Sequence, residues 1–454
     1  PSRSCGSCST ATYTPTSSQN RYADEWARFL NQTDIAAVSG DQNIKLYTID
    51  VFKDQQDTEQ TKLLMSMAKA GGGQYFAATS ENEIVSALQR AMSEIQSVNS
   101  VFASSSLPVS VNTQGTYLNQ VFIGMFRPEA SAKPRWAGNL KQYQFAFING
   151  QLKLADKNNE SAVSSATGFV TPCATSLWSS DTGTYWNYAG AVAKGTCLDA
   201  SRTSNFPTAG SSSTYSDAPD GEIVEKGGAG QKLRGVVSSG GTLTSSSTNY
   251  TTRVLKTCDG SSATSCTALT DFSSSNAAVT TALSATGLID WIRGKDTDDE
   301  NANASTTEMR PSAHGDVVHS QPAVIDFGSP TGVVAFYGDN TGVFHAVSGG
   351  KAASDGNELW GFIAPELYSK LSRQRSNTPL VKLSGVADPG ATAKDYFFDG
   401  SIGVHQKNST VWIYPTMRRG GRALYAFDVS TPSSPTLKWR RGCFTGSTTD
   451  DSAC

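Results

Sequence analysis

The stretch GVVAFYGDNTGVFHAVSGG, residues 332–350, has the pattern of an apolar strand, a Gly-rich turn and a second apolar strand, and Trp360 follows it. The stretch STVWIYPTMRRGGRALYAFDVS, residues 409–430, has the same arrangement and is followed by Trp439. The alanine of HAV or YAF precedes the tryptophan by 14 residues in the first copy and by 13 in the second. Such recurring strand–turn–strand units are typical of β-propeller blades. Residues 311–454 are therefore predicted to be all-β, with about two or three of the roughly four to eight blades that a closed propeller needs.

Residues 20–98 alternate between helical and strand patterns. RYADEWARFLN (21–31) and DTEQTKLLMSMAKA (57–70) have helical periodicity, whereas NIKLYTIDVF (43–52) and QYFAATS (74–80) read as apolar strands. This order predicts a parallel sheet covered by helices. The pattern resembles the last part of a von Willebrand factor A-type domain. Since no apolar strand ending in DxSxS precedes it, we expect the first half of such a domain to be missing from this chain.

The helical segments predict particular buried faces and caps. Gly71–Gly73 is expected to supply a left-handed cap after the second helix. Ser80 is predicted to cap a third helix, with Glu83 completing a capping box. The first helix is predicted to place Tyr22, Trp26, Phe29 and Leu30 on one face. The third helix is predicted to bury a stripe formed by Ile84, Leu88, Ala91, Ile95 and Val98.

Residues 100–155 change to the two-residue period of β-strands. LNQVFIGMFRP and NLKQYQFAFINGQLKLA predict strands, with Asn149–Gly150 as a hairpin turn. Residues 156–285 are rich in Ser, Thr, Gly and Asn, which predicts an ordered, loop-rich region with scattered strands. ALSATGLIDWIRG and APELYSKLSRQ (364–374) predict short helices.

Composition limits the classes of function. The 454 residues include 37 Lys and Arg against 40 Asp and Glu, a formal net charge of −3. Without a basic excess to neutralise phosphates, nucleic acid is not expected as a partner. No run of 18 apolar residues is present, so no membrane span is expected. The chain begins at Pro1 without a signal-peptide pattern, which we interpret as a processed or trimmed product.

The eight cysteines predict an oxidising compartment. Their number is even, and they occur as close neighbours in Ser/Thr/Gly-rich loops. The expected disulfides are Cys5–Cys8, Cys173–Cys197, Cys258–Cys266 and Cys443–Cys454, although eight cysteines allow 105 connectivities. Free thiols in a cytosolic enzyme are the less favoured alternative. The CGSC string lacks the flanking strand and helix of a redox site, the His of a haem motif and the second pair of a zinc ribbon.

Six strings resemble the PilC/PilY-type adhesins found at the tips of bacterial type IV pili, and they follow the order of that family. They are MFRPEASAKPRWAGNLKQY (125–143), GLIDWIRG (287–294), MRPSAHGDVVHSQPAV (309–324), FYGDNTGVFHAVSGG (336–350), GNELWGFIAPEL (356–367) and YFFDGSIGV (396–404). The resemblance implies a von Willebrand A-like domain followed by a quinoprotein-like β-propeller, a mixed α/β and all-β fold class. We expect residues 1–99 to be the C-terminal part of the first domain, 100–310 a β-rich, disulfide-bearing connecting region, and 311–454 the start of the propeller.

The same resemblance implies a non-enzymatic pilus-tip adhesin and biogenesis factor. Such a protein passes through the periplasm and outer membrane, is secreted to the cell surface, sits on minor pilins and supports pilus assembly and attachment to a host or abiotic surface. Two alternatives remain open. One is a quinoprotein-like propeller dehydrogenase, and the other is a structural subunit of another surface filament.

Two groups of polar residues invite a chemical interpretation. HGDVVHSQP holds two histidines beside Asp and Ser, which could be catalytic or metal-binding; the favoured interpretation is that these side chains fix the entry into a strand by hydrogen bonds. KDTDDENAN offers Asp296, Asp298 and Glu300 as oxygen ligands for calcium, against a solvated acidic linker. The family's usual calcium loop is not found in this chain. The signature residues that the resemblance implies, mostly structural, are Arg135, Trp136, His314, Gly315, Asp316, His319, Asp339, His345 and Trp360.

Overall fold

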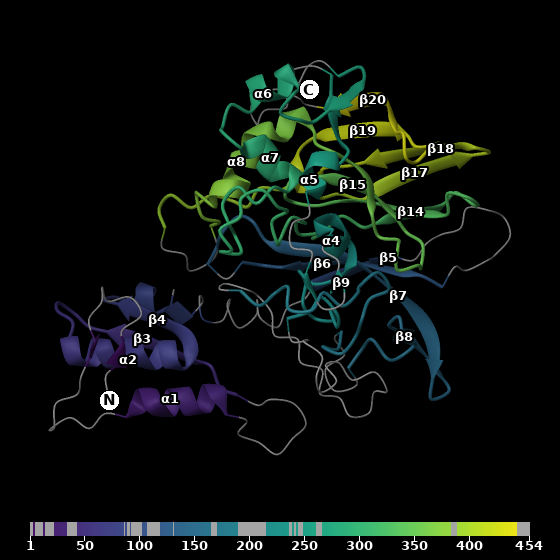
Figure 1. The fold of residues 1–454 in the computed structure, drawn as a ribbon. Coiled ribbons are helices and arrows are strands. Elements are labelled where there is room, and N and C mark those ends of the chain that lie inside the picture. Colours follow the sequence, from purple (N-terminus) through teal and green to yellow (C-terminus); the bar gives the residue numbers. More distant parts are fainter. Residues whose placement is uncertain are drawn as a thin grey trace. The chain divides into compact units, whose positions relative to one another are not determined.

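The computed structural model describes residues 3–4, 12–13, 22–33, 43–85, 87–88, 91, 102–106, 119–129, 131–164, 170–188, 215–235, 238–239, 242–243, 248–259, 266–382 and 388–442. The chain separates into two compact units, one with residues 1–99, 130–132 and 380–393, the other with 100–129, 133–379 and 394–454. Both units contain helices and sheets (Figure 1), and no sheet of the described residues closes into a barrel. The mixed α/β and β-rich character is thereby confirmed at this coarse level. No helix in the described part of the chain is long and apolar enough to cross a membrane.

The first unit contains a pair of parallel strands. β3 (Leu46–Val51) and β4 (Gly72–Ala78) pair in parallel, and α2 (Thr58–Ala70) connects them, as the alternating pattern predicted. The Asp57 side chain caps α2 by accepting hydrogen bonds from two backbone N–H groups of its first turn. Gly72, at φ +69°, takes the left-handed conformation that was expected after the helix.

The first helix, α1 (Ala23–Gln32), leaves its aromatic face largely open to solvent. Asp24 and Ala27 are buried, and Ser66 of α2 donates a 2.7 Å hydrogen bond to Asp24. Most of the predicted face is open to solvent: Tyr22 is 45% exposed, Trp26 65% and Phe29 49%. Periodicity shows which residues share a face, but not which face a neighbouring element covers.

Residues 81–85 form the first turn of the third helix, and its cap differs slightly from the prediction. Ser80 Oγ accepts a 3.4 Å hydrogen bond from the backbone N–H of Glu83, as a capping box requires. The Glu83 carboxylate, however, accepts from the backbone N–H and hydroxyl of Thr79, one residue earlier than expected. Of the residues predicted to form the buried stripe, Ala91 is buried, Ile84 is half-buried and Leu88 is 52% exposed. Ile95 and Val98 lie outside the described residues.

In the second unit, four antiparallel strands form one sheet. In order they are β5 (Phe102–Ser106), β6 (Val121–Arg127), β7 (Ala137–Ile148) and β8 (Gln151–Ala155). The turn between β7 and β8 is Asn149–Gly150, as predicted. Both residues have positive φ, 51° and 76°, which a two-residue hairpin of this type requires.

Two further sheets contain the sequence repeat. The six-stranded sheet has the order β12 (Leu269–Asp271), β11 (Leu255–Cys258), β16 (Glu358–Phe362), β15 (Phe344–Ser348), β14 (Val333–Gly338), β13 (Ala323–Asp326). The four-stranded sheet has the order β17 (Ile402–Lys407), β18 (Thr410–Pro415), β19 (Ala423–Asp428), β20 (Thr436–Gly442). Within the first of them, β13 to β16 form an antiparallel series like β17 to β20.

The two series share an irregularity as well as a strand order. Ala346 lies opposite Trp360, and the register then shifts at the next residue. Ala426 lies opposite Trp439, and the register shifts at the same point. A β-bulge at equivalent positions is a feature of the repeating unit rather than a local accident.

The remaining elements are short, and several of them lie in the loop-rich region of residues 156–285. They are β1 (Arg3–Ser4), β2 (Thr12–Tyr13), α4 (Gly228–Arg234), β9 (Ser238–Ser239), β10 (Thr242–Leu243), α5 (Asn249–Thr252), α6 (Ala277–Ala282), α7 (Leu288–Arg293), η1 (Pro365–Leu367), α8 (Tyr368–Ser376) and η2 (Arg418–Gly420). The helices η1–α8 and α7 occur where the sequence predicted helices.

Apolar cores cover both faces of the β13–β16 series. One core lies between it and β17–β20 and includes Phe336, Phe344, Trp360, Phe362, Ile413, Tyr425 and Phe427. The other core joins its opposite face to β6 and β7 and includes Ala335, Tyr337 and Val347 with Phe122, Leu140 and Trp178. Among the described residues, β17–β20 has a core on one face only.

Candidate functional site

Two signature histidines meet in the interior of the second unit. The rings of His314 and His345 stack with centroids 5.1 Å apart and planes inclined by 5°. Tyr337 lies directly opposite His345 across β14 and β15, and its ring stacks on both histidines. His314 is 4% exposed and His345 is 1% exposed. The strings HGDVVHSQP and GDNTGVFHAV therefore form one buried cluster.

His314 has partners that suit a neutral imidazole. Its Nδ1 lies 2.8 Å from the Gly315 carbonyl, to which it donates, and its Nε2 accepts from the Tyr337 hydroxyl at 2.7 Å. Burial, and then the positive charge of His345, lower the pKa of His314 to about 4. The ring therefore stays uncharged near neutral pH.

His345 lies between two carboxylates. Its Nδ1 is 2.7 Å from Glu358 Oε1 and its Nε2 is 3.1 Å from Asp339 Oδ2. Burial by itself lowers the pKa of His345, but Asp339 and Glu358 together outweigh it and raise the pKa. Arg253 forms a two-pronged ion pair with the same Glu358, at 2.5 and 2.9 Å. The two cations and two carboxylates balance one another in the interior.

Glu358 and Asp339 are held as carboxylates by this arrangement. Burial is the largest influence and raises the pKa of Glu358, yet Arg253 and His345 together lower it to about 2. Asp339 likewise has a pKa below its usual range, because His345 and backbone N–H groups outweigh burial. Asp339 also accepts hydrogen bonds from the backbone N–H groups of Gly315 and of residues 341–343. It thereby ties the β14–β15 turn to HGDVVHSQP.

Asp316 connects the same string to the PRWAGNL signature. It accepts a 2.9 Å hydrogen bond from Asn340 and forms a 3.2 Å ion pair with Lys394. The Lys394 ammonium also lies 4.5 Å from the centroid of the Trp136 ring, a cation–π contact, and donates to the Pro134 carbonyl. Trp136 is thus packed against a buried cation rather than fully open to solvent.

The second half of HGDVVHSQP makes contacts of the same kind. His319 Nδ1 lies 2.7 Å from Asp399 Oδ2, and Ser320 Oγ accepts from the backbone N–H of Gly338 at 2.8 Å. Asp399 belongs to the DGSIGV string. His314, Asp316, His319 and Ser320 of the motif therefore each contact a neighbouring strand or turn.

Arg135 takes part in a separate stack around Trp291 of α7. The guanidinium of Arg310 lies 3.9 Å from the centre of the Trp291 ring, and that of Arg135 lies 5.3 Å from it. Arg135 also pairs with Glu300 at 2.7 Å. Trp360, the remaining signature aromatic, is fully buried, and its Nε1 donates to the Pro432 carbonyl at 2.7 Å.

The three acidic calcium candidates have different partners. Asp296 accepts the backbone N–H of Glu300, and burial raises the pKa of Asp296 to about 6. Asp298 pairs with Arg375 at 2.6 Å, whereas Glu300 pairs with Arg135. No group of three or more His, Cys, Asp or Glu side chains in the described ranges is arranged to hold a metal ion. This observation counts neither for nor against calcium binding, which stays a prediction.

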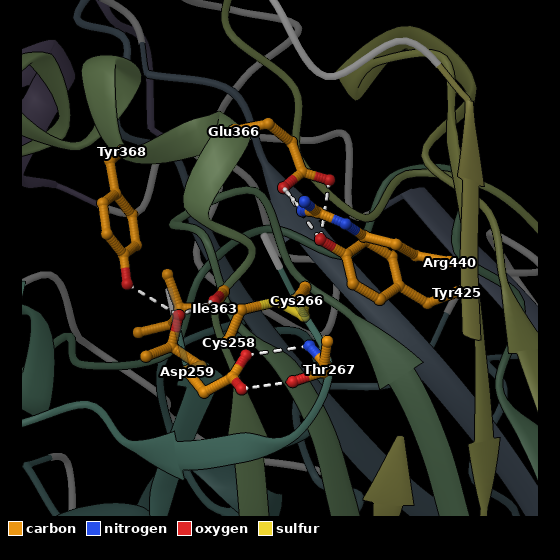
Figure 2. Close-up of a disulfide and its surroundings, with 10 residues drawn as sticks. Cys258, Asp259, Cys266, Thr267, Ile363, Glu366, Tyr368, Tyr425 and Arg440 are labelled. Atoms are coloured by element: carbon orange, nitrogen blue, oxygen red, sulfur yellow. Dashed lines mark hydrogen bonds and ion pairs between the residues drawn. A yellow bond between two sulfur atoms is a disulfide. The ribbon is translucent and has the colours of Figure 1, made fainter. Parts of the chain in front are cut away.

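One predicted disulfide lies wholly within the described residues. Cys258 and Cys266 are bonded, with Cα atoms 4.9 Å apart. Figure 2 shows the bond beside Asp259, whose carboxylate accepts from the Thr267 backbone and hydroxyl at 2.8 and 2.6 Å. Cys173 is also disulfide-bonded. The other predicted cysteines, Cys5, Cys8, Cys197, Cys443 and Cys454, lie outside the described residues.

Three members of the buried cluster were missed by sequence reasoning: Arg253, Tyr337 and Glu358. Arg253 lies in a Ser/Thr-rich segment with no motif, and it reaches Glu358 from 105 residues away. Glu358 and Tyr337 lie inside strings that carry the family resemblance, and strand pairing brings them to His345. A carboxylate within an apolar strand, as in NELWGF, is a signal that could have identified Glu358 as a buried, paired group.

Neither His314 nor His345 has a free ring nitrogen that faces solvent. Catalysis by a histidine requires contact with the proton that it transfers, and here internal groups take both ring nitrogens of His314 and His345. The arrangement suits the holding together of separate segments. Comparison with known proteins adds no assignment, since no family, curated protein or solved structure matches the chain.

Proposed function

We propose that this protein is a non-enzymatic adhesin and assembly factor at the tip of type IV pili, seated on minor pilins and exposed at the cell surface. The resemblance of six strings in family order is the starting point. The observation that supports it most is that four of these strings converge on one buried network. His314, Asp339 and Glu358 come from three different strings, and each contacts residues of another.

A mechanical role is consistent with these contacts. The buried Arg253–Glu358 ion pair joins segments that are distant in sequence, whereas the Cys258–Cys266 disulfide and the bulged strand pairs fix neighbouring segments to one another. Breaking a buried pair leaves an uncompensated charge and is costly. A protein that carries load between a filament and a surface benefits from such cross-connections.

The test is immunogold labelling of intact pili with an antibody raised against residues 311–454. We expect gold at filament tips and its loss when minor pilins are deleted. Gold on the envelope with bare tips would contradict the proposal. In that case a quinone-binding assay on the purified chain would decide for or against the dehydrogenase alternative.

A further inference from the structure

Lys394, Asp316 and Asn340 form a chain of contacts inside the second unit. Asp316 Oδ1 lies 3.2 Å from Lys394 Nζ, and Asp316 Oδ2 accepts a 2.9 Å hydrogen bond from Asn340 Nδ2. Asp316 is fully buried, Asn340 is 1% exposed and the Lys394 side chain is 3% exposed. One carboxylate therefore holds a primary amine and a carboxamide together in the interior.

The surroundings of Lys394 make a proton transfer to Asp316 easier. The Lys394 Nζ also donates to the Pro134 carbonyl at 3.0 Å, and the Trp136 and Tyr396 rings lie 4.5 and 5.6 Å from it. Burial raises the pKa of Asp316, and this outweighs the opposite influence of Lys394 and Asn340. Moving a proton from Lys394 to Asp316 replaces two buried charges by two neutral groups. The neutral amine of a lysine is a nucleophile.

The Asn340 carboxamide is held as an electrophile. Its Oδ1 accepts a 3.1 Å hydrogen bond from the backbone N–H of Phe397. A fixed N–H group at this position polarises the carbonyl and stabilises the negative charge that develops on the oxygen when the carbon is attacked. The Asn340 Nδ2 donates to Asp316 and, at 3.3 Å, to Asp399 Oδ1. The nitrogen that must leave after such an attack is therefore already in contact with a proton carrier.

A second buried pair, Lys141 and Asp220, lacks this arrangement. Both side chains are fully buried, and Lys141 Nζ lies 3.4 Å from Asp220 Oδ2. The Lys141 ammonium, however, donates to the backbone carbonyls of residues 220, 221 and 223. The Asp220 carboxylate accepts from Ser176 and Ser179, where Asp316 accepts from a carboxamide. The carboxamide on the second oxygen is thus what distinguishes the Lys394 pair.

We propose that Lys394 and Asn340 become joined by an isopeptide bond, with Asp316 transferring the protons. The bond from Lys394 Nζ to Asn340 Cγ forms, and the Cγ–Nδ2 bond of Asn340 breaks. Two of the three Nζ protons pass through Asp316 to the departing nitrogen, which leaves as ammonium while Asp316 ends ionised. No atom changes its oxidation state, so the reaction needs no further reactant.

The bond connects two parts of the chain that are distant in sequence. Asn340 lies in the turn between β14 and β15, and Lys394 directly follows residues 380–393, which belong to the first unit. The point where the chain returns to the second unit is then held covalently to that turn. Such a bond resists extension under load. It requires only the contacts around Asp316, so it does not depend on the proposed place at the pilus tip.

Mass spectrometry of the full, reduced chain tests the proposal. We expect a mass about 17 Da below that of the sequence, because one ammonia is lost. After trypsin digestion of the denatured protein, the peptide with Asn340 should be joined to a peptide that is uncleaved at Lys394, since trypsin does not cleave after an acylated lysine. Lys141 is the internal control and should be cleaved normally.

Two variants identify the participants. Lys394→Arg keeps the positive charge but has no amine that can form the bond, and Asp316→Asn removes the proton carrier. Both should have the full mass of their own sequences. Lys141→Arg, the matched control, should keep the mass deficit of the wild type. Circular dichroism establishes that each variant is folded, and the digestion of the wild type decides the matter even if one is not.

Several outcomes would overturn the proposal. A wild type with the full mass of its sequence would do so, as would a deficit that persists in Lys394→Arg. A deficit of about 18 Da, the mass of water, would place the bond on Asp316 instead of Asn340. A deficit with normal cleavage after Lys394 would indicate a succinimide, which an asparagine forms with its own backbone.

Discussion

The β13–β16 series and the β17–β20 sheet have the same strand order and the same bulge, yet they differ in what covers them. The first series has apolar cores on both faces and a buried ionic cluster beside one of them. The second has an apolar core on one face and cations on the other. Equivalent positions in a repeat thus have different energetic roles, because burial depends on neighbours and not on the repeat itself.

The largest contrast is expected between the two equivalent tryptophans. Trp360→Ala removes a fully buried side chain and should lower the free energy of unfolding by roughly 3–5 kcal/mol. Trp439→Ala removes a half-buried ring and should cost about 1 kcal/mol. Urea unfolding of both variants measures the difference. Equal losses would show that both faces are covered in solution.

The next effect concerns the buried network of Arg253, Glu358, His345 and Asp339 in the first series. Arg253→Met leaves Glu358 with His345 as its remaining charged partner and should cost about 3 kcal/mol. Lys438→Met, in the exposed pair with Asp428, should cost at most about 1 kcal/mol. Chemical denaturation of the two methionine variants compares them. A cost for Arg253→Met no greater than for Lys438→Met would refute the idea of a charge-balanced cluster.

The Cys258–Cys266 disulfide restrains the β11–β12 hairpin, which extends the sheet of the first series. The described residues contain no such hairpin beside β17–β20. Cys258 and Cys266 are eight residues apart, and β11, which ends at Cys258, pairs with β16. Replacing both by Ser should cost about 2 kcal/mol, since a short loop is then free in the unfolded chain. Differential scanning calorimetry with and without reductant measures this. A reduced wild type as stable as the oxidised protein would contradict it.

The smallest expected effect is a pH dependence of the first series. The pKa of His345 is raised in the folded state, so its stabilising contribution is complete below the unfolded value of about 6.5 and is lost as pH rises through the folded pKa. Stability should therefore fall in the wild type as pH rises above about 6.5. His345→Gln should remove this slope, whereas His405→Gln, at an exposed position of β17, should keep it. The midpoints of urea unfolding are measured across this pH range. A dependence on pH in His345→Gln equal to that of the wild type would refute the prediction.

Local patterns predicted the elements well. The alternation around Asn149–Gly150 predicted the β7–β8 hairpin, and the spacing to Trp360 and Trp439 predicted two matching strand series. The exposed aromatic face of α1 was not predictable in the same way. Its periodicity is correct, but α1 buries Asp24 and Ala27, and Ser66 of α2 donates a hydrogen bond to Asp24. That contact joins residues 42 positions apart.

The candidate site likewise contains some residues that the sequence could identify and others that it could not. The histidines and aspartates of HGDVVHSQP and GDNTGVFHAV stand out in the sequence because polar residues interrupt apolar strands. Arg253 and Lys394 do not, because a cation in a loop resembles any solvated cation until its partner is known. Their roles depend on Glu358 and Asp316, which lie 105 and 78 residues away.

The amino-acid sequence by itself determined the strand and helix periods, the turns and the repeat, since each depends on neighbouring residues. Only the tertiary structure decided which faces are buried, which carboxylate balances which cation, and which of two equivalent tryptophans is covered. The physical reason is that burial and ionic pairing depend on distance in space, which chain folding sets between residues that are remote in sequence.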